Sequence, residues 1–254
     1  YNFKKLIMRL FVLILVTILS DSQDINTIFQ ESNEYYTNGK YQNAVNGYQN
    51  IIDLGFESAE LYFNLGNTYY KLNNIPESNY YYEKAKVLSP NDKDISTNLI
   101  FAQNLRIDKI ERLPVTQIQN FKLIFLDVFT ERGWSILFII IIWSLCSAFV
   151  LYLLLKDPKF KRLFFSLSIV FLIFSSLILY LSFEKKELND TKYAIIYDKE
   201  IEVWSEPNKI SELKFLLHEG TKVKQIDMIE DWVSIQLENG TLGWIKFSGI
   251  KVLD

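Results

Sequence analysis

Two long apolar runs, separated by a short basic segment, dominate the hydropathy pattern of this chain. Residues 134–155 and 163–183 contain no Asp, Glu, Lys, Arg or His. At about 1.5 Å of rise per residue, each run forms a helix of roughly 30 Å, which matches the hydrocarbon core of a bilayer. The pattern predicts a transmembrane hairpin, in preference to a pair of core helices in a soluble protein.

The segment 156–162 between the two runs forms the predicted turn of the hairpin. Its cations are Lys156, Lys159, Lys161 and Arg162. Cations in short loops favour the cytoplasm, whereas the outer flanks of the hairpin have mixed charge. We therefore expect the turn to lie in the cytoplasm and the rest of the mature chain to lie outside it.

The amino terminus has the layout of a signal peptide at residues 1–22. Lys4, Lys5 and Arg9 precede a short apolar stretch, and small polar residues follow it near a possible cleavage site after Ser22. The alternative is an uncleaved membrane anchor.

Residues 23–110 repeat themselves at an offset of 34 residues. Small residues coincide with small ones and tyrosines with tyrosines, in the pairs Ser32/Gly66, Tyr35/Tyr69, Ala44/Ser78, Tyr48/Tyr82, Ile51/Ala85 and Phe56/Pro90. This period and pattern resemble the tetratricopeptide repeat, a helix–turn–helix unit, although Ser78 replaces the usual Ala and the first copy lacks the final Pro. We expect an all-α repeat domain with turns at Gly39 and Asn73–Asn74, closed by a half repeat over 92–110 with Leu99, Ala102 and Leu105 on one face.

The first helix of each repeat has a face that points away from the repeat core. In the tetratricopeptide family this face is the concave, peptide-binding surface, which implies a groove formed by Phe29, Asn33, Tyr36, Phe63, Asn67, Tyr70 and Lys71. Asn33 and Asn67 occupy equivalent positions, and an amide there can both donate to and accept from a peptide backbone. The alternative is that these are ordinary solvated residues.

Residues 111–133 form a predicted juxtamembrane linker with an amphipathic helix. Phe121, Ile124 and Phe125 are apolar there, whereas Lys122 and Asp127 are polar, which is typical of a helix lying at a membrane surface. Trp134, which follows, is suited to the headgroup region.

After a predicted linker at 184–192, residues 193–254 change to short alternating strands. Apolar residues alternate at Tyr193, Ile195 and Tyr197, at Ile201 and Val203, at Val223, Ile226 and Met228, and at Val233, Ile235 and Leu237. Asn239–Gly240 predicts a tight hairpin turn. The order of Glu219–Gly220–Thr221 and Gly243–Trp244–Ile245 resembles the bacterial SH3-like domain, which implies a small all-β barrel.

A group of polar and aromatic residues is the candidate ligand surface of this barrel. It comprises Tyr197, Trp204, Glu230, Asp231 and Trp232, which could hold a peptide or a glycan of the cell wall. The alternative is that the tryptophans pack the barrel.

Composition excludes several classes of function. The net charge of −3 argues against nucleic acid as a partner. The single cysteine, Cys146, lies inside the first apolar run, and the single histidine, His218, lies in the strand region without a nucleophile motif nearby. We therefore predict no catalytic residues, no metal site and no cofactor, and we regard an enzyme such as a wall amidase as the weakest hypothesis.

Taken together, the order of these segments resembles the BatE family of aerotolerance operon proteins. The resemblance implies a multi-domain protein of the bacterial inner membrane, with both terminal domains in the periplasm. It also implies a scaffold in an envelope complex that confers tolerance of oxygen or envelope stress, with Bat-family partners carrying von Willebrand factor A-type domains and a MoxR-type ATPase. Binding of peptidoglycan through the SH3-like domain is the alternative function.

Overall fold

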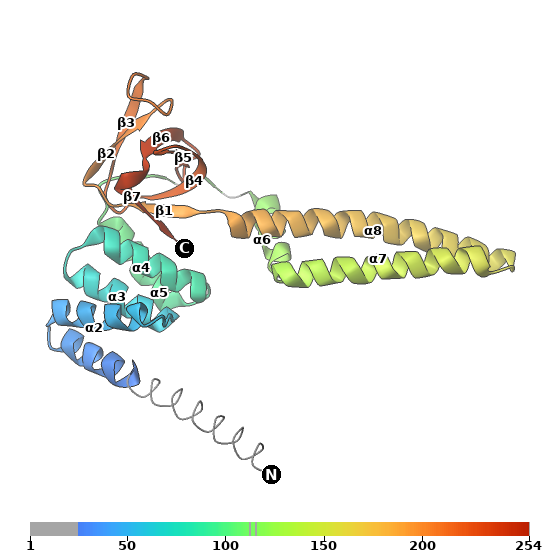
Figure 1. The fold of residues 1–254 in the computed structure, drawn as a ribbon, viewed down its shortest axis with the longest axis horizontal. Coiled ribbons are helices and arrows are strands. Elements are labelled where there is room, and N and C mark those ends of the chain that lie inside the picture. Colours follow the sequence, from blue (N-terminus) through green and yellow to red (C-terminus); the bar gives the residue numbers. More distant parts are fainter. Residues whose placement is uncertain (1–24, 112, 115, 254) are drawn as a thin grey trace, which may run out of the picture. The chain divides into compact units, whose positions relative to one another are not determined.

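The computed structural model describes residues 25–111, 113–114 and 116–253 of the chain (Figure 1). They form two compact units, of which one combines residues 25–111 with 192–253 and the other comprises 113–191. The predicted signal peptide at 1–22 lies outside the described residues.

The first unit begins with a stack of helices. A helix over residues 25–37 is followed by α2 (Tyr41–Asp53), α3 (Ala59–Lys71), α4 (Ile75–Leu88) and α5 (Lys93–Asn104). The helices alternate in direction and are joined by short turns (Figure 1), as a helix–turn–helix repeat requires. The two and a half repeats expected from the sequence are therefore present.

Local signals in the sequence explain where these helices begin and end. Ser58, Asn74 and Asp92 cap α3, α4 and α5, because each side chain accepts hydrogen bonds from backbone N–H groups of the first turn. The turns use residues in the left-handed region at the predicted positions, with φ of +74° at Gly39 and +56° at Asn73.

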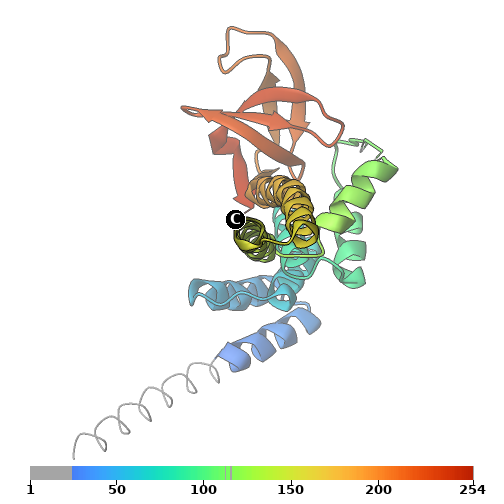
Figure 2. The same cartoon turned by 90° about the vertical axis from the view of Figure 1, so that its right-hand side faces the viewer.

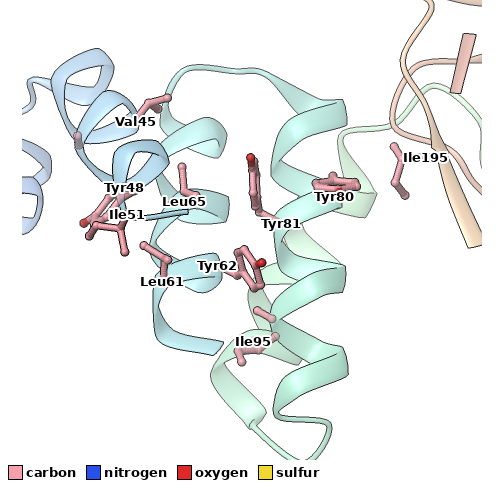
Figure 3. Close-up of a cluster of buried hydrophobic side chains, with 12 residues drawn as sticks. Val45, Tyr48, Ile51, Leu61, Tyr62, Leu65, Tyr80, Tyr81, Ile95 and Ile195 are labelled. Carbon is pink, nitrogen blue, oxygen red and sulfur yellow. The ribbon is translucent and has the colours of Figure 1, made fainter. Parts of the chain in front are cut away.

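Close packing of α3 against α4 depends on small residues, as the repeat pattern predicted. A Cβ on Gly66 would lie 2.6 Å from Cδ1 of Tyr82. Ser78 is buried beside it and donates from Oγ to the Gly66 carbonyl at 3.0 Å. Figure 3 shows the adjoining core, in which Tyr62 and Tyr81 lie between the helices. Leu105, however, ends α5 and is 43% exposed, so it does not share the buried face of Leu99 and Ala102.

Seven antiparallel strands complete the first unit. They are β1 (Tyr193–Ile196), β2 (Glu200–Trp204), β3 (Leu213–His218), β4 (Lys222–Ile229), β5 (Trp232–Gln236), β6 (Leu242–Lys246) and β7 (Ile250–Leu253). Their order in the sheet is β3-β2-β6-β5-β4-β1-β7. Figure 2 shows these strands in orange to red.

The sheet is not closed, so the expected barrel is wrong. β3 and β7 are the two end strands and do not pair with each other. The ladder between β2 and β6 is reduced to one registered residue pair, Trp204 with Trp244. At the other end, β1 and β7 contact α4 instead of turning back to close the sheet.

Strand β1 is buried on both of its faces. Ala194 and Ile196 belong to the core of the sheet. Ile195 joins the core of the helix stack (Figure 3), and Tyr197 is packed against the same core. Of the predicted alternating residues, Ile195 and Tyr197 face the helices rather than the core of the sheet, whereas Tyr193 is exposed.

The remaining strands follow the predicted pattern in part. Val233, Ile235 and Leu237 are buried, and β5 and β6 pair as a hairpin. Gly240 has a φ of +85° in the turn between them. Ile226 and Met228 are exposed, because β4 has a register irregularity between Gln225 and Asp227 and its end extends beyond the core.

The second unit consists of three helices, α6 (Gln117–Leu126), α7 (Glu131–Leu154) and α8 (Pro158–Asp190). In the described part of the chain, α7 and α8 are the helices long and apolar enough to cross a membrane. The turn between them is shorter than predicted, because α8 already includes Lys159, Lys161 and Arg162. α8 also continues through residues 184–190, where a linker was expected.

The amphipathic lead-in is helical as predicted. Phe121 and Ile124 of α6 are exposed, which suits a helix in contact with a lipid surface. Trp134 is buried at the start of α7 and donates from its indole nitrogen to the Leu126 carbonyl at 3.1 Å, so it fixes the turn from α6 into α7.

Candidate functional site

Two neighbouring pockets lie along the first helices of the repeats. One, of about 220 Å³, is lined by Tyr36, Asn67, Tyr70, Lys71, Tyr82, Asn98 and Phe101. The other, of about 230 Å³, is lined by Asn33, Tyr36, Thr37, Tyr48, Asn64 and Asn67. Tyr36 and Asn67 line both pockets, so together they form one continuous surface, which we call the concave groove.

Each pocket is lined by an asparagine whose amide oxygen accepts hydrogen bonds from one tyrosine and one further asparagine. The Oδ1 atom of Asn33 accepts from the Tyr48 hydroxyl at 2.5 Å and from Nδ2 of Asn64 at 3.1 Å.

The pocket of about 220 Å³ repeats this arrangement 34 residues later along the chain. The Oδ1 atom of Asn67 accepts from the Tyr82 hydroxyl at 2.7 Å and from Nδ2 of Asn98 at 2.8 Å. Each of the three residues is displaced by one repeat, so the half repeat that carries Asn98 completes the second site. We call these two sets the asparagine triads.

The triads determine which atoms remain for a ligand. An amide oxygen has two lone pairs, and in Asn33 and Asn67 both accept hydrogen bonds from the protein. The amide nitrogen of each side chain makes no hydrogen bond to another described residue. Each asparagine can therefore offer a fixed donor, but not the donor and acceptor together that the sequence analysis expected.

The other predicted groove residues divide into two groups. Tyr36, Tyr70 and Lys71 line the pockets. Phe29 instead packs against Tyr48, with ring centroids 5.8 Å apart, and Phe63 packs against Tyr82 at 5.9 Å. These two phenylalanines therefore pack against the tyrosines of the triads.

Asn64, Asn98 and Phe101 line the groove but were not predicted as groove residues. The 34-residue offset in the sequence relates Asn64 to Asn98 and could have indicated both.

The tyrosines of the triads are neutral over a wide range of pH. Burial, with smaller contributions from Tyr36 and Glu60, raises the pKa of Tyr48 to about 12. Burial likewise raises the pKa of Tyr82. Both hydroxyls therefore keep the proton that they donate to the asparagine oxygens.

A second polar site, which was not predicted from the sequence, joins α4 to the strands. The Tyr197 hydroxyl donates to Oε2 of Glu77 at 2.8 Å, and Nζ of Lys251 lies 3.3 Å from the same oxygen. Nζ of Lys251 also lies 4.0 Å from the ring centroid of Tyr80, and the Tyr80 ring packs edge-on against Tyr197. Burial and the neighbouring Glu77 raise the pKa of Tyr197.

Two further contacts extend this interface along α4. Nδ2 of Asn79 donates to the Gly220 carbonyl at 3.0 Å, and both residues are buried. Nζ of Lys222 lies 2.7 Å from Oε2 of Glu83, whose side chain is 8% exposed. Gly220 has a φ of +81°, and a Cβ there would lie 2.8 Å from Ile75, so no larger residue fits this contact.

The segment after α5 supplies the last part of the interface. The carboxylate of Asp108 accepts from the backbone N–H of His218 at 2.7 Å and from the Thr221 hydroxyl at 2.7 Å, and Nδ1 of His218 lies 2.8 Å from its other oxygen. Glu200 lies 3.8 Å from Nε2 of His218. His218 thus has a structural role in joining β3 to the helical part.

The predicted ligand surface of the strand region does not form one cluster. Tyr197 is engaged with α4, and Trp232 is 7% exposed with Nζ of Lys246 4.5 Å from its ring. Trp204 pairs with Trp244 at the junction of β2 and β6. Glu230 and Asp231 form the exposed turn between β4 and β5, where Glu230 has a φ of +52°.

One signal in the sequence could have revealed the interface with α4. Tyr80, Tyr81 and Tyr82 are consecutive, and all three are buried. Successive residues of a helix point in directions about 100° apart, so three buried aromatics in a row require packing on most of its circumference. Helix α3 covers Tyr81 and helix α5 covers Tyr82, so burial of Tyr80 requires a further layer, which the strands supply through Tyr197.

Two family models match the helical part of the chain. A tetratricopeptide repeat model matches residues 59–92, and a second TPR repeat model matches residues 33–73. The chain therefore contains tetratricopeptide repeats, a module typical of protein–protein interaction scaffolds. No curated protein matches the chain closely enough to count as a relative.

Proposed function

We propose that this protein is a non-enzymatic adaptor that is anchored in a membrane and binds an extended segment of a partner protein in its concave groove. The observation that carries the proposal is the repetition of the asparagine triads. Two amide donors, each fixed by a buried tyrosine hydroxyl and a second asparagine, are displaced by one repeat along the groove. Such preformed donors suit the carbonyl groups of an extended peptide, because little side-chain entropy is lost on binding.

The membrane topology is the second part of the proposal. Residues 25–111 and 192–253 pack as one unit, so both must lie on the same side of any membrane that the intervening segment crosses. This supports an even number of crossings, and α7 and α8 supply two. The cations Lys156, Lys159, Lys161 and Arg162 near the turn support a cytoplasmic turn and extracytoplasmic domains.

The identity of the complex follows from resemblance alone. The order of repeats, hairpin and SH3-like strands resembles the BatE family, which suggests partners among the Bat proteins of the bacterial inner membrane and a role in envelope or oxidative stress. The proposed ligand site is the groove and not the strand region, because two of the five residues suggested there, Tyr197 and Trp232, are engaged in internal packing.

Replacement of Asn67 tests the groove. Asn67→Asp keeps an oxygen that accepts from Tyr82 and Asn98 but removes the N–H donors, so partner binding should fall at least about tenfold with little change in the free energy of unfolding.

A photo-crosslinker at position 70 in intact cells, followed by mass spectrometry, identifies the captured partner. The same crosslinker at Tyr35, which lines neither pocket, is the matched control.

The double variant Asn67→Ala with Tyr70→Ala removes a donor and an aromatic wall together. It should abolish co-purification of the captured partner at unchanged protein abundance, whereas Asn50→Ala with Tyr35→Ala should leave co-purification intact. Equal recovery of the partner with both double variants excludes the groove as the binding site.

A further inference from the structure

The hairpin of α7 and α8 has an open groove on its surface. Its volume is about 460 Å³, and its walls include Trp143, Ser144 and Ser147 of α7 and Phe164 and Phe171 of α8. The three residues of α7 lie at spacings of one and three residues, so they share one face of the helix within about 6 Å along its axis.

Trp143 is an unusual residue for this position. It lies halfway along α7 and is 71% exposed, although tryptophan in membrane helices concentrates at the interfaces. Its indole N–H makes no hydrogen bond to any described residue, whereas the indole of Trp134 is bonded to the Leu126 carbonyl. In the hydrocarbon core of a bilayer, a donor without an acceptor costs several kcal/mol.

Acceptors for such a donor lie on the same face. Oγ of Ser144 donates to the Ile140 carbonyl at 2.9 Å, and Oγ of Ser147 donates to the Trp143 carbonyl at 2.8 Å. Each hydroxyl has thereby used its proton but keeps lone pairs that can accept. The face therefore presents one free donor and two acceptors at nearly the same depth.

We propose that a second copy of this chain occupies the groove, related to the first by a two-fold axis parallel to the membrane normal. In such a pair the two α7 helices face each other, and the indole of Trp143 in each copy donates to the hydroxyl of Ser144 or Ser147 in the other. The two-fold axis satisfies both indoles at once, because donor and acceptors lie at matching depth on one surface.

The shape of the face agrees with the same occupant. The large Trp143 adjoins the small Ser144, Ser147 and Ala148, so each copy carries both a projecting ring and a recess. Small residues allow close approach of transmembrane helices, where packing and hydrogen bonds drive association. The inference rests on the proposed insertion of the hairpin into a membrane, and the experiment below separates the two.

Cysteine crosslinking in native membranes tests the contact. Cys146→Ser removes the single cysteine of the full chain, and one cysteine is then introduced at position 147 or at position 149. Phe149 is the control, because it is 48% exposed yet lies about 200° around the helix from Ser147. Oxidation should crosslink Ser147→Cys at least about ten times more efficiently than Phe149→Cys, as a band of twice the mass of the uncrosslinked protein.

The other outcomes overturn the proposal. Equal crosslinking at the two positions excludes a defined interface. A product of Ser147→Cys with any other mass shows that a different helix occupies the groove. Carbonate extraction of the same membranes is the separate check, since release of the protein into the soluble fraction refutes membrane insertion itself.

Trp143→Phe tests the hydrogen bonds, because it keeps an aromatic ring and removes the N–H. Loss of one such bond in a membrane weakens association about threefold, so loss of the symmetric pair should raise the dimer dissociation constant about tenfold. Energy transfer between labelled full-length chains in bicelles measures this constant. Adding Ser144→Ala and Ser147→Ala to Trp143→Phe should cause no comparable further loss, and an unchanged constant for Trp143→Phe alone refutes the bonding scheme.

Discussion

The ion pair between Lys222 and Glu83 joins the strands to the repeat helices, and its removal should weaken the whole first unit. Nζ of Lys222 lies 2.7 Å from the carboxylate of Glu83, whose side chain is 8% exposed. Lys222→Met keeps most of the aliphatic chain but leaves a buried carboxylate whose remaining side-chain donor is Gln103 at 3.4 Å. Removal of one partner of a buried ion pair costs about 3–5 kcal/mol. Because Lys222 is partly exposed, we expect Lys222→Met to lower the free energy of unfolding by about 3 kcal/mol.

A double-mutant cycle separates the pair from its surroundings. Glu83→Gln in the Lys222→Met background removes the stranded charge, so the double variant should recover about 2 kcal/mol relative to Lys222→Met alone. Pulse proteolysis of the full chain in detergent across a urea series measures the folded fraction of the first unit, whatever the state of the hairpin.

The matched control is another lysine–carboxylate pair in the same sheet. Nζ of Lys246 lies 3.9 Å from Asp231, whose side chain is 87% exposed, and such surface pairs contribute at most about 1 kcal/mol. Lys246→Met should therefore change the free energy of unfolding much less than Lys222→Met. A coupling energy for Lys222 and Glu83 below about 0.5 kcal/mol would refute the interpretation that this pair holds the two parts together.

Three further predictions concern single residues. Gly66→Ala should lower the free energy of unfolding by about 1–2 kcal/mol in urea melts, because the new Cβ meets Tyr82 at 2.6 Å and outweighs the gain in helix propensity; a neutral or higher midpoint would contradict it. Because the pKa of Tyr48 is raised in the folded protein, the Tyr48 hydroxyl loses its proton at a lower pH in the unfolded state. The free energy of unfolding should therefore decline from about pH 10 to pH 12, and decline less in Tyr48→Phe. Equal declines for the two proteins in urea melts at a series of pH values would contradict this prediction. Asp108→Ala should lower the free energy of unfolding by about 3 kcal/mol and speed proteolysis near residues 105–116, because it leaves the His218 N–H and the Thr221 hydroxyl without an acceptor. Unchanged proteolysis would exclude a role for Asp108 in holding this segment to the strands.

Most of the helical region could be predicted from local patterns in the sequence. The 34-residue offset located the repeats, because small residues must coincide wherever two helices approach as closely as α3 and α4 do at Gly66. Turn residues at Gly39 and Asn73 were recognisable because few residues adopt a positive φ at low cost. The same offset placed Asn33 and Asn67 in equivalent positions, although their bonding partners lie on other helices.

The strand region shows why the rest was missed. Alternation along residues 193–197 indicates that one face is buried, but it does not say against what. Tyr197 was therefore assigned to a ligand surface, and β1 to the face of a barrel. The residues that Tyr197 contacts in the fold, Glu77 and Tyr80, lie more than a hundred residues away in sequence.

Sequence alone determined the kinds of segment in this protein, because period, charge and length are properties of a short stretch of chain: two apolar helices long enough for a bilayer, helical repeats before them and strands after them. Tertiary structure decided that the repeats and the strands are one body. The reason is that a hydrogen bond such as that from Asn79 to the Gly220 carbonyl depends on groups 141 residues apart, and no local pattern encodes their meeting.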